Sequence, residues 1–263
     1  MKNDDKKRRK FLKQIAGLGV LGIAAAGTVW GGKVLLEREE LPLRPPGALE
    51  EHEFLALCIK CGQCLQVCPY DSILLEDIDG MAGVGTAYID PQLRGCYLCK
   101  ALPCILACPS GALDHDIADD VRKVHMGVAV IVNEPACLAL YNKPVPESIR
   151  DLIYEHTKVL TPKERREKRV FDLPNPSEKR QLQIDLLKKV ESYVGKQCTI
   201  CADLCPYPEK ELAIGMVAKN GGYLPEIREK CVGCGACVEL CPTDVLSIIP
   251  RATYEEVYKR KKA

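Results

Sequence analysis

The sequence predicts a small, loop-rich α+β fold made of two tandem copies of one unit, with a helical insertion in the second copy. Three observations lead to this prediction. Cysteines recur in four short groups along the chain of 263 residues. Short apolar segments with the length and composition of strands flank these groups. Sixty residues without cysteine separate Cys137 from Cys198, and their apolar positions recur at helical spacing.

Each of the four cysteine groups ends in Cys-Pro. The groups are Cys58-Cys61-Cys64-Cys68-Pro69, Cys96-Cys99-Cys104-Cys108-Pro109, Cys198-Cys201-Cys205-Pro206 and Cys231-Cys234-Cys237-Cys241-Pro242. The first and fourth have the spacing C-x2-C-x2-C-x3-C-P, which is typical of [4Fe–4S] binding. The second group widens one gap to four residues, a change that a loop can absorb. The pattern therefore predicts iron–sulfur clusters and electron transfer.

The third group is one cysteine short of a complete set. Its spacing matches the second, third and fourth positions of the run, and Cys137 is the only cysteine left over among the sixteen. A single cysteine is more often a small buried apolar residue than a ligand. The even count and the missing position favour Cys137 as a ligand.

In ferredoxins with two clusters, the fourth cysteine of each run binds the other cluster. This rule predicts four [4Fe–4S] clusters and their ligands. Cluster 1 would be bound by Cys58, Cys61, Cys64 and Cys108, cluster 2 by Cys68, Cys96, Cys99 and Cys104, cluster 3 by Cys137, Cys198, Cys201 and Cys241, and cluster 4 by Cys205, Cys231, Cys234 and Cys237.

Other uses of cysteine fit the pattern less well. Disulfides are typical of small secreted chains, and zinc ribbons use C-x2-C pairs without a third and fourth cysteine before proline. An enzyme with a substrate bound at a cluster would need an iron that lacks a thiolate. That interpretation would require that Cys137 is not a ligand. The sequence also offers no candidate for a general acid or base.

The amino terminus has the features of a twin-arginine (Tat) export signal. Arg8 and Arg9 are followed by Phe11 and Leu12 and then by an uncharged stretch, residues 14–32. Such a signal would place the protein in the periplasm through the Tat translocase, at the outer face of the cytoplasmic membrane. Cleavage of the signal and its retention as a membrane anchor both remain open.

Breakers and charge divide the chain into segments. Residues 1–32 form the signal or anchor and 33–50 a linker rich in Pro, Arg and Glu; 51–135 form the first unit, 136–252 the second, and 253–263 a basic tail. Strands are expected at 72–75, 86–89, 128–132, 223–227 and 245–249. The formal charge of +1 and an aromatic content of 5% argue against a nucleic-acid partner.

The insertion, at about 142–196, is expected to hold two or three helices. Ile149, Ile153 and Leu160 recur at helical spacing, and the sequence from Thr161 to Glu164 forms a capping box with proline at the first helical position. Ser177 is expected to cap a further helix that Gly195 ends. This insertion could shield cluster 3 or form a docking surface for a redox partner.

Together, the twin-arginine pattern, the four motifs and two segments resemble the NapG/MauM family of ferredoxin-type proteins. The segments are 96–113 (CYLCKALPCILACPSGAL) and 126–133 (MGVAVIVN). The resemblance covers nearly the whole chain after the linker. This sequence departs from the family in one place, because the family has a shorter excursion between the first two cysteines of its third motif than the sixty residues found here.

The resemblance implies a non-catalytic electron-transfer subunit of a quinol dehydrogenase complex. A membrane partner of the NapH type would oxidise quinol, and this subunit would pass the electrons to a cytochrome or terminal reductase such as periplasmic nitrate reductase. Association with the membrane would come through that partner or through an uncleaved signal. The alternative is an electron-transfer subunit of another exported molybdoenzyme or of a nitrite reductase system.

Overall fold

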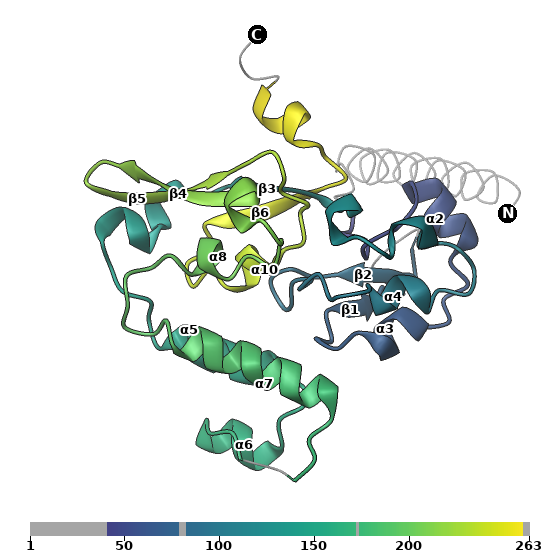
Figure 1. The fold of residues 1–263 in the computed structure, drawn as a ribbon, viewed down its shortest axis with the longest axis horizontal. Coiled ribbons are helices and arrows are strands. Elements are labelled where there is room, and N and C mark those ends of the chain that lie inside the picture. The colour runs from purple at the N-terminus through teal and green to yellow at the C-terminus, as the bar shows by residue number, and fades with distance from the viewer. Residues whose placement is uncertain (1–40, 79–82, 172–173, 260–263) are drawn as a thin grey trace, which may run out of the picture. The chain divides into compact units, whose positions relative to one another are not determined.

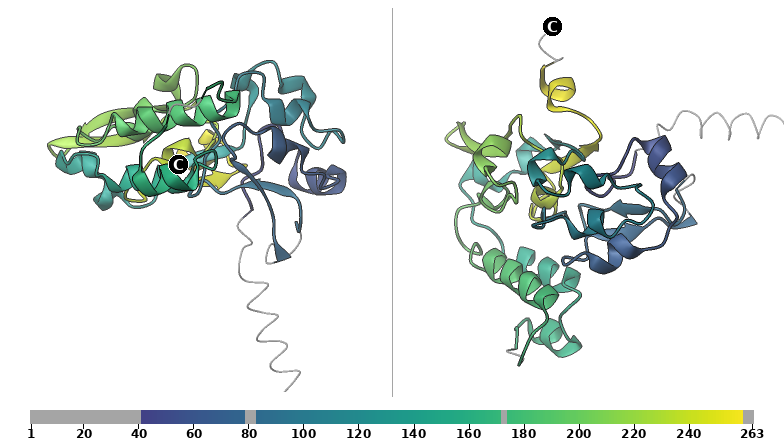
Figure 2. Two further views of the ribbon diagram at one scale, coloured as in Figure 1. Left: turned by 90° about the horizontal axis from the view of Figure 1, so that it is seen from below. Right: turned by 45° about the vertical axis from the view of Figure 1, so that its right-hand side comes forward.

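The structure, a computed structural model, describes residues 41–78, 83–171 and 174–259 (Figure 1; Figure 2). The predicted signal residues Arg8, Arg9, Phe11 and Leu12 lie outside the described residues, as does most of the predicted linker. Among the helices that are described, none is long and apolar enough to cross a membrane.

Within the described residues, six strands form three separate two-stranded antiparallel sheets. Strand β1 (Ile73–Leu75) pairs with β2 (Ala87–Ile89), β3 (Gly127–Ile131) pairs with β6 (Leu246–Pro250), and β4 (Ile214–Lys219) pairs with β5 (Gly222–Ile227). The five strands expected from the sequence are confirmed to within a residue or two at their ends. Strand β4 was not predicted, although Asn220 and Gly221, both with positive φ, form the Asn-Gly turn that marks a hairpin.

The pairing of β3 with β6 crosses the boundary expected at residue 135. Strand β3 belongs to the segment predicted as the first unit, yet its partner lies near the end of the chain, with Ala129 opposite Ile248. Val128 and Ala129 are fully buried. The chain before the second unit therefore contributes a strand to that unit's core, whereas the boundary itself stays a prediction.

Most other elements are a single turn or two long. The short α-helices are α2 (Glu51–Leu57), α3 (Gln63–Val67), α4 (Pro103–Leu106), α8 (Ile200–Asp203), α9 (Lys210–Ala213) and α10 (Ala236–Glu239). The 3-10 turns are η2 (His115–Ile117), η3 (Val121–Lys123), η4 (Glu134–Ala136) and η5 (Leu138–Tyr141), and η6 (Glu255–Lys259) is a π turn. Helices this short gain little from their own hydrogen bonds, so packing around the cysteines must hold them.

The described part of the chain between Cys137 and Cys198 contains three α-helices: α5 (Ser148–His156), α6 (Pro162–Glu167) and α7 (Glu178–Glu191). The capping box at Thr161 is confirmed, and the Ser177 hydroxyl accepts a hydrogen bond from Arg180 N–H at the start of α7. The expectation that Gly195 ends this helix is wrong. Helix α7 ends at Glu191, and the residues that follow turn back to pair with the chain at Val145.

A buried ion pair holds α6 against α7. Arg180 Nη2 lies 2.5 Å from Glu164 Oε1, and Arg180 Nη1 donates to the Val159 carbonyl at 2.7 Å. Burial alone would raise the pKa of Glu164, but hydrogen bonds from Arg180 and from the backbone N–H groups of Phe171 and Thr161 outweigh it and lower this pKa to about 2. Such a charge is tolerated in the interior because its partners satisfy it.

Helix α7 also contacts the first half of the chain. Gln183, itself buried, donates from Nε2 to the Pro69 carbonyl at 2.8 Å and to Asp71 Oδ2 at 2.9 Å. Lys179 forms an ion pair with the same Asp71 carboxylate. The helical segment is therefore anchored next to Cys68.

Buried side chains form two hydrophobic clusters. One gathers residues of 43–126 together with Tyr207, Ala213, Val232, Cys234 and Ala236. The other gathers residues of 128–246, including Val145 and Ile149 from the helical segment and Val238 and Leu240 around α10. Cysteines belong to both clusters, so the candidate metal ligands are part of the core itself.

Candidate metal centres

All sixteen cysteines lie in the described residues, and none is in a disulfide. They line four cavities, four cysteines to each. Site 1 has Cys58, Cys61, Cys64 and Cys108; site 2 has Cys68, Cys96, Cys99 and Cys104; site 3 has Cys137, Cys198, Cys201 and Cys241; site 4 has Cys205, Cys231, Cys234 and Cys237. The structure thus brings together the same four sets of cysteines that the sequence analysis grouped.

Short helices distribute the cysteines between neighbouring sites. Helix α3 carries Cys64, which lines site 1, and it ends at Cys68, which lines site 2. Helix α4 does the reverse, with Cys104 in site 2 and the following Cys108 in site 1. The backbone of Cys68 is extended (φ −65°, ψ 114°), so its side chain leaves the helical face on which Cys64 lies. Pro69 then prevents the helix from continuing.

The second half of the chain repeats this arrangement. Cys201 of α8 lines site 3 and Cys205, just after the helix, lines site 4. Cys237 of α10 lines site 4 and Cys241 lines site 3. Each pair of sites is therefore tied together by two short helices.

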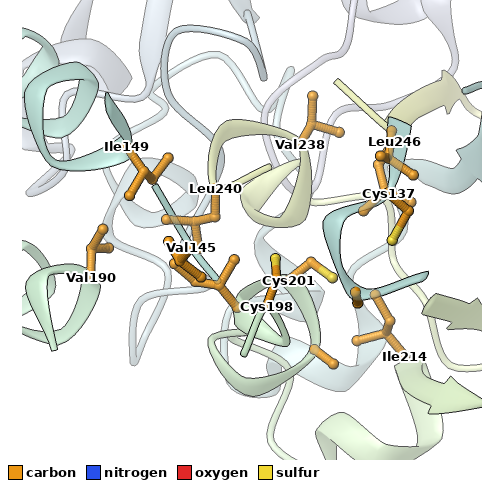
Figure 3. Packing of buried hydrophobic residues seen from close by; sticks show 14 of the residues in the cluster. Cys137, Val145, Ile149, Val190, Cys198, Cys201, Ile214, Val238, Leu240 and Leu246 are labelled. Carbon is orange, nitrogen blue, oxygen red and sulfur yellow. The ribbon is translucent and has the colours of Figure 1, made fainter. Parts of the chain in front are cut away.

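Cys137 reaches site 3 from far along the chain. It lies between the 3-10 turns η4 and η5, and its Sγ is 3.9 Å from the Tyr223 carbonyl oxygen of β5. Figure 3 shows Cys137, Cys198 and Cys201 in one buried cluster with Ile149 and Val190 of the helical segment. The long excursion from Cys137 to Cys198 returns to the same cavity.

The four sites differ in exposure. Cys61 of site 1 is the one exposed cysteine of the sixteen. In the same cavity Ile59 is 64% exposed and Leu75 is 39% exposed. In site 3, by contrast, Cys137, Cys198 and Cys201 are all buried. Site 1 is thus open to solvent at an apolar surface, whereas site 3 is covered.

Burial sets the protonation of the thiols when no metal is bound. It raises the pKa of Cys64, Cys198 and Cys205 to about 11 and that of Cys99 to about 12. Metal and cluster ligands bind as thiolates, so loading these sites must release protons.

Backbone N–H groups point at several sulfurs. The N–H of Ser72 donates to Cys68 Sγ at 3.4 Å and the N–H of Val245 donates to Cys241 Sγ at 3.3 Å. The N–H of Ala129 reaches Cys231 Sγ at 3.5 Å. Hydrogen bonds of this kind stabilise charge on sulfur and raise the reduction potential of a cluster.

Neighbouring sites are connected by shared helices or by a backbone contact. Sites 1 and 2 share α3 and α4, and sites 3 and 4 share α8 and α10. Sites 2 and 4 meet where Cys96 N–H donates to the Cys234 carbonyl at 2.7 Å. These connections order the sites as 1, 2, 4 and 3.

No group of three or more His, Cys, Asp or Glu side chains within the described ranges is arranged to hold a single metal ion. The four sulfurs of each set instead line a cavity. An inorganic cube takes one thiolate at each of its four irons, so its ligands stand apart, whereas the four ligands of a zinc ion meet at one point. The donor sets fit a [4Fe–4S] cluster.

Comparison with known families agrees with this chemistry. The family model described as "4Fe-4S dicluster domain" matches residues 57–112, and the one described as "4Fe-4S binding domain" matches residues 225–247. The chain is therefore a ferredoxin-type iron–sulfur protein of mixed helix and strand with two such domains. No solved structure matches it.

Curated relatives extend the similarity to most of the chain. The methylamine utilization ferredoxin-type protein MauM of Methylorubrum extorquens is 30% identical over 243 residues, which cover 88% of this chain and 86% of that protein. The ferredoxin-type protein NapG of Haemophilus influenzae is 29% identical, over 92% of this chain and 70% of that protein. For NapG of Escherichia coli the identity is 27%, over 89% of this chain and 80% of that protein. The chain belongs to the MauM/NapG family of ferredoxin-type proteins, as the sequence motifs indicated.

Two charged residues near the cysteines were not singled out from the sequence. Arg94 and Glu239 are both buried, and they form an ion pair between the segment that precedes Cys96 and helix α10. The motif spacing shows neither of them, because their partnership joins residues far apart in the chain.

Proposed function

We propose that the protein carries four [4Fe–4S] clusters, one in each site, and passes single electrons along them. The observation that carries this proposal is the four separate cavities, each lined by four cysteines. When bound, a [4Fe–4S] cluster accepts and releases one electron. The chain supplies the thiolates, excludes water from the buried sites and donates N–H groups to sulfur.

The test is the iron and acid-labile sulfide content of protein purified without oxygen. About sixteen irons and about sixteen sulfides per chain are expected for four clusters. A plateau at about twelve irons and about twelve sulfides in fully loaded protein would show that one of the four cysteine sets does not hold a cluster. A colourless protein loaded with zinc would reject the proposal altogether.

The position of Cys137 argues against the alternative of an enzyme that binds its substrate at an iron without a thiolate ligand. That alternative needs a site with only three cysteines, and Cys137 lies with the other three cysteines of site 3. Electron transfer without substrate chemistry is therefore the function that the geometry supports best.

Electrons would enter or leave through site 1. Cys61 is exposed, and the partly exposed apolar side chains of Ile59 and Leu75 line the same cavity. Exposed apolar patches of this kind are typical of protein interaction sites. The order of the sites then gives an electron path from site 1 through sites 2 and 4 to site 3, or the reverse.

The partners we propose follow from the family. A NapH-like membrane protein would oxidise quinol and deliver the electrons, and a cytochrome or terminal reductase such as nitrate reductase would receive them. The protein would work in the periplasm, exported through the Tat translocase by the signal at Arg8 and Arg9. It would be held at the membrane by its partner or by an uncleaved signal.

Co-purification after gentle membrane solubilisation tests the partners. A bound multi-span quinol-oxidising protein is expected, and a molybdoenzyme or nitrite reductase subunit in its place would reassign the pathway.

Export is tested by replacing Arg8 and Arg9 with Lys, which preserves charge. The periplasmic pool should then disappear, whereas it should persist with Lys6 and Lys7 replaced by Arg. A pool that survives the first change would exclude the Tat route.

A further inference from the structure

The step between sites 2 and 4 differs from the other two steps in how the chain connects the sites. Sites 1 and 2 share α3 and α4, and sites 3 and 4 share α8 and α10, so covalent segments join them. Sites 2 and 4 share no element. They meet where Cys96 N–H donates to the Cys234 carbonyl at 2.7 Å, in a parallel bridge between Cys96 and Gly235.

This meeting point needs an unusually close approach of two backbones. A Cβ placed on Gly95 would lie 2.4 Å from the Ala236 nitrogen and 2.6 Å from the Gly235 carbonyl carbon. Real side chains do not approach backbone atoms so closely, so only glycine fits at position 95. The hydrogen bond from Cys96 to Cys234 depends on this contact.

The buried carboxylate of Glu239 stabilises this close contact of the two backbones, which we call the junction. Glu239 Oε2 accepts a hydrogen bond from Gly95 N–H at 2.8 Å and another from the Tyr97 hydroxyl at 2.9 Å. The first bond joins residues 144 positions apart in the sequence. The Glu239 side chain has no exposed surface, and it lies on α10 between Cys237 of site 4 and Cys241 of site 3.

Arg94 completes the junction from the other side. Its Nη1 lies 2.9 Å from Glu239 Oε1. This contact is an ion pair rather than an aligned hydrogen bond, and neither of the two atoms has a hydrogen-bond partner among the described residues. Its Nη2 donates to Thr157 Oγ1 at 3.3 Å, just after helix α5. Because a buried charge is costly when it is alone, each member of the pair requires the other.

We propose that electrons cross between the two halves of the protein through the Cys96–Cys234 backbone contact, and that Glu239 and Arg94 are the positioning residues that hold it closed. This inference rests on the proposed function. In the step, site 2 loses one electron and site 4 gains it, or the reverse, and no bond or proton is transferred. Electronic coupling falls steeply with distance and faster through space than through bonds, so opening this contact slows the middle step alone.

The test uses the full chain loaded with four clusters and compares three variants. Glu239→Ala removes the acceptor for Gly95 N–H, Glu239→Gln retains an amide oxygen that can accept the same bond, and Glu167→Ala is the control on an exposed residue of α6. One electron per chain is delivered by flash photoreduction, and EPR of samples frozen at increasing times follows its redistribution. Reference spectra of Cys61→Ser and Cys137→Ser distinguish sites 1 and 3.

The fast redistribution between the halves should be lost in Glu239→Ala, kept in Glu239→Gln and unchanged in Glu167→Ala. In Glu239→Gln the loss of a buried negative charge should shift the reduction potentials of the clusters on either side of this contact, at sites 2 and 4, to more positive values. If Glu239→Ala fails to fold, the potential shift in Glu239→Gln becomes the test of whether Glu239 acts at the contact between sites 2 and 4. Four redox-active clusters with unchanged transfer, or with equal potential shifts at all four sites, would overturn this inference and leave the proposed function intact. Fewer than four clusters in the parent protein would count against the proposed function instead.

Discussion

Sites 1 and 3 are each lined by four cysteine thiols, but they differ in how far these thiols are exposed to solvent. Site 1 draws its cysteines from residues 58–108 and leaves Cys61 exposed. Site 3 draws its cysteines from residues 137–241 and buries three of them, and the helical segment leaves at Cys137 and returns at Cys198. The difference shows how one ligand pattern can serve an exposed contact point and a protected interior site. The chain around the motif, and not the motif, sets the exposure.

The largest effect is expected from removing one ligand at each of these two sites. Cys137→Ser should lose up to about four irons per chain, because it removes one of the four thiolates that would hold the site 3 cluster. The 138–197 segment should then become sensitive to protease, because Cys137 holds its beginning at site 3. Cys61→Ser should leave that segment protected, because site 1 does not contact it. Iron analysis and limited proteolysis measure both. Equal protease sensitivity in the two variants would contradict the comparison.

The ion pair between α6 and α7, in the segment that returns to site 3 at Cys198, provides the next largest effect. Glu164→Ala leaves Arg180 buried without its partner, and breaking such a pair costs about 3–5 kcal/mol. The expected result is local unfolding of α6 and α7, measured by hydrogen exchange, and faster loss of the site 3 cluster in air while site 1 is unaffected. Glu167→Ala, on the exposed side of the same helix, is the matched control. If both variants behave alike, the ion pair does not hold the helices in place.

The same carboxylate predicts a dependence on pH. The pKa of Glu164 is lowered to about 2 in the folded chain, below its ordinary value of 4.5. A lowered pKa gives stability that is complete above the ordinary value and is lost as the pH falls from about 4.5 through about 2. Denaturant titrations of the apo and loaded protein should show the parent losing stability in this range more steeply than Glu164→Gln. Parallel curves would exclude the contribution.

The smallest effect concerns the contact between α7 and site 2. Gln183→Ala removes the hydrogen bonds to the Pro69 carbonyl and to Asp71, with an expected loss of about 1–3 kcal/mol for two buried bonds. Gln181→Ala, on the exposed side of the same helix, should change stability by about 0.5 kcal/mol or less. Thermal unfolding of the loaded proteins compares them. A Gln183→Ala protein as stable as Gln181→Ala would show that the helical segment is not anchored there.

Local chemistry made part of the fold predictable. Five strands, the capping box at Thr161 and the cap at Ser177 were found because short apolar runs and capping residues act within a few positions of the chain. Strand β4 was missed although Asn220-Gly221 marks its turn, and the end of α7 was placed too late at Gly195. In both places the packing of neighbours decided between conformations that the local sequence allowed.

By itself, the sequence determined the chemistry of this protein. The spacing of the cysteines and the prolines after them grouped the thiols into four sets, because each cluster takes two or three of its ligands from one short run and sixteen cysteines fill four sets without remainder. Only the tertiary structure decided the order of the sites, which of them is exposed, and the junction of Arg94, Gly95 and Glu239 between the halves. Those features join residues far apart in the chain, and no local pattern records a contact that exists only once both halves have folded against each other.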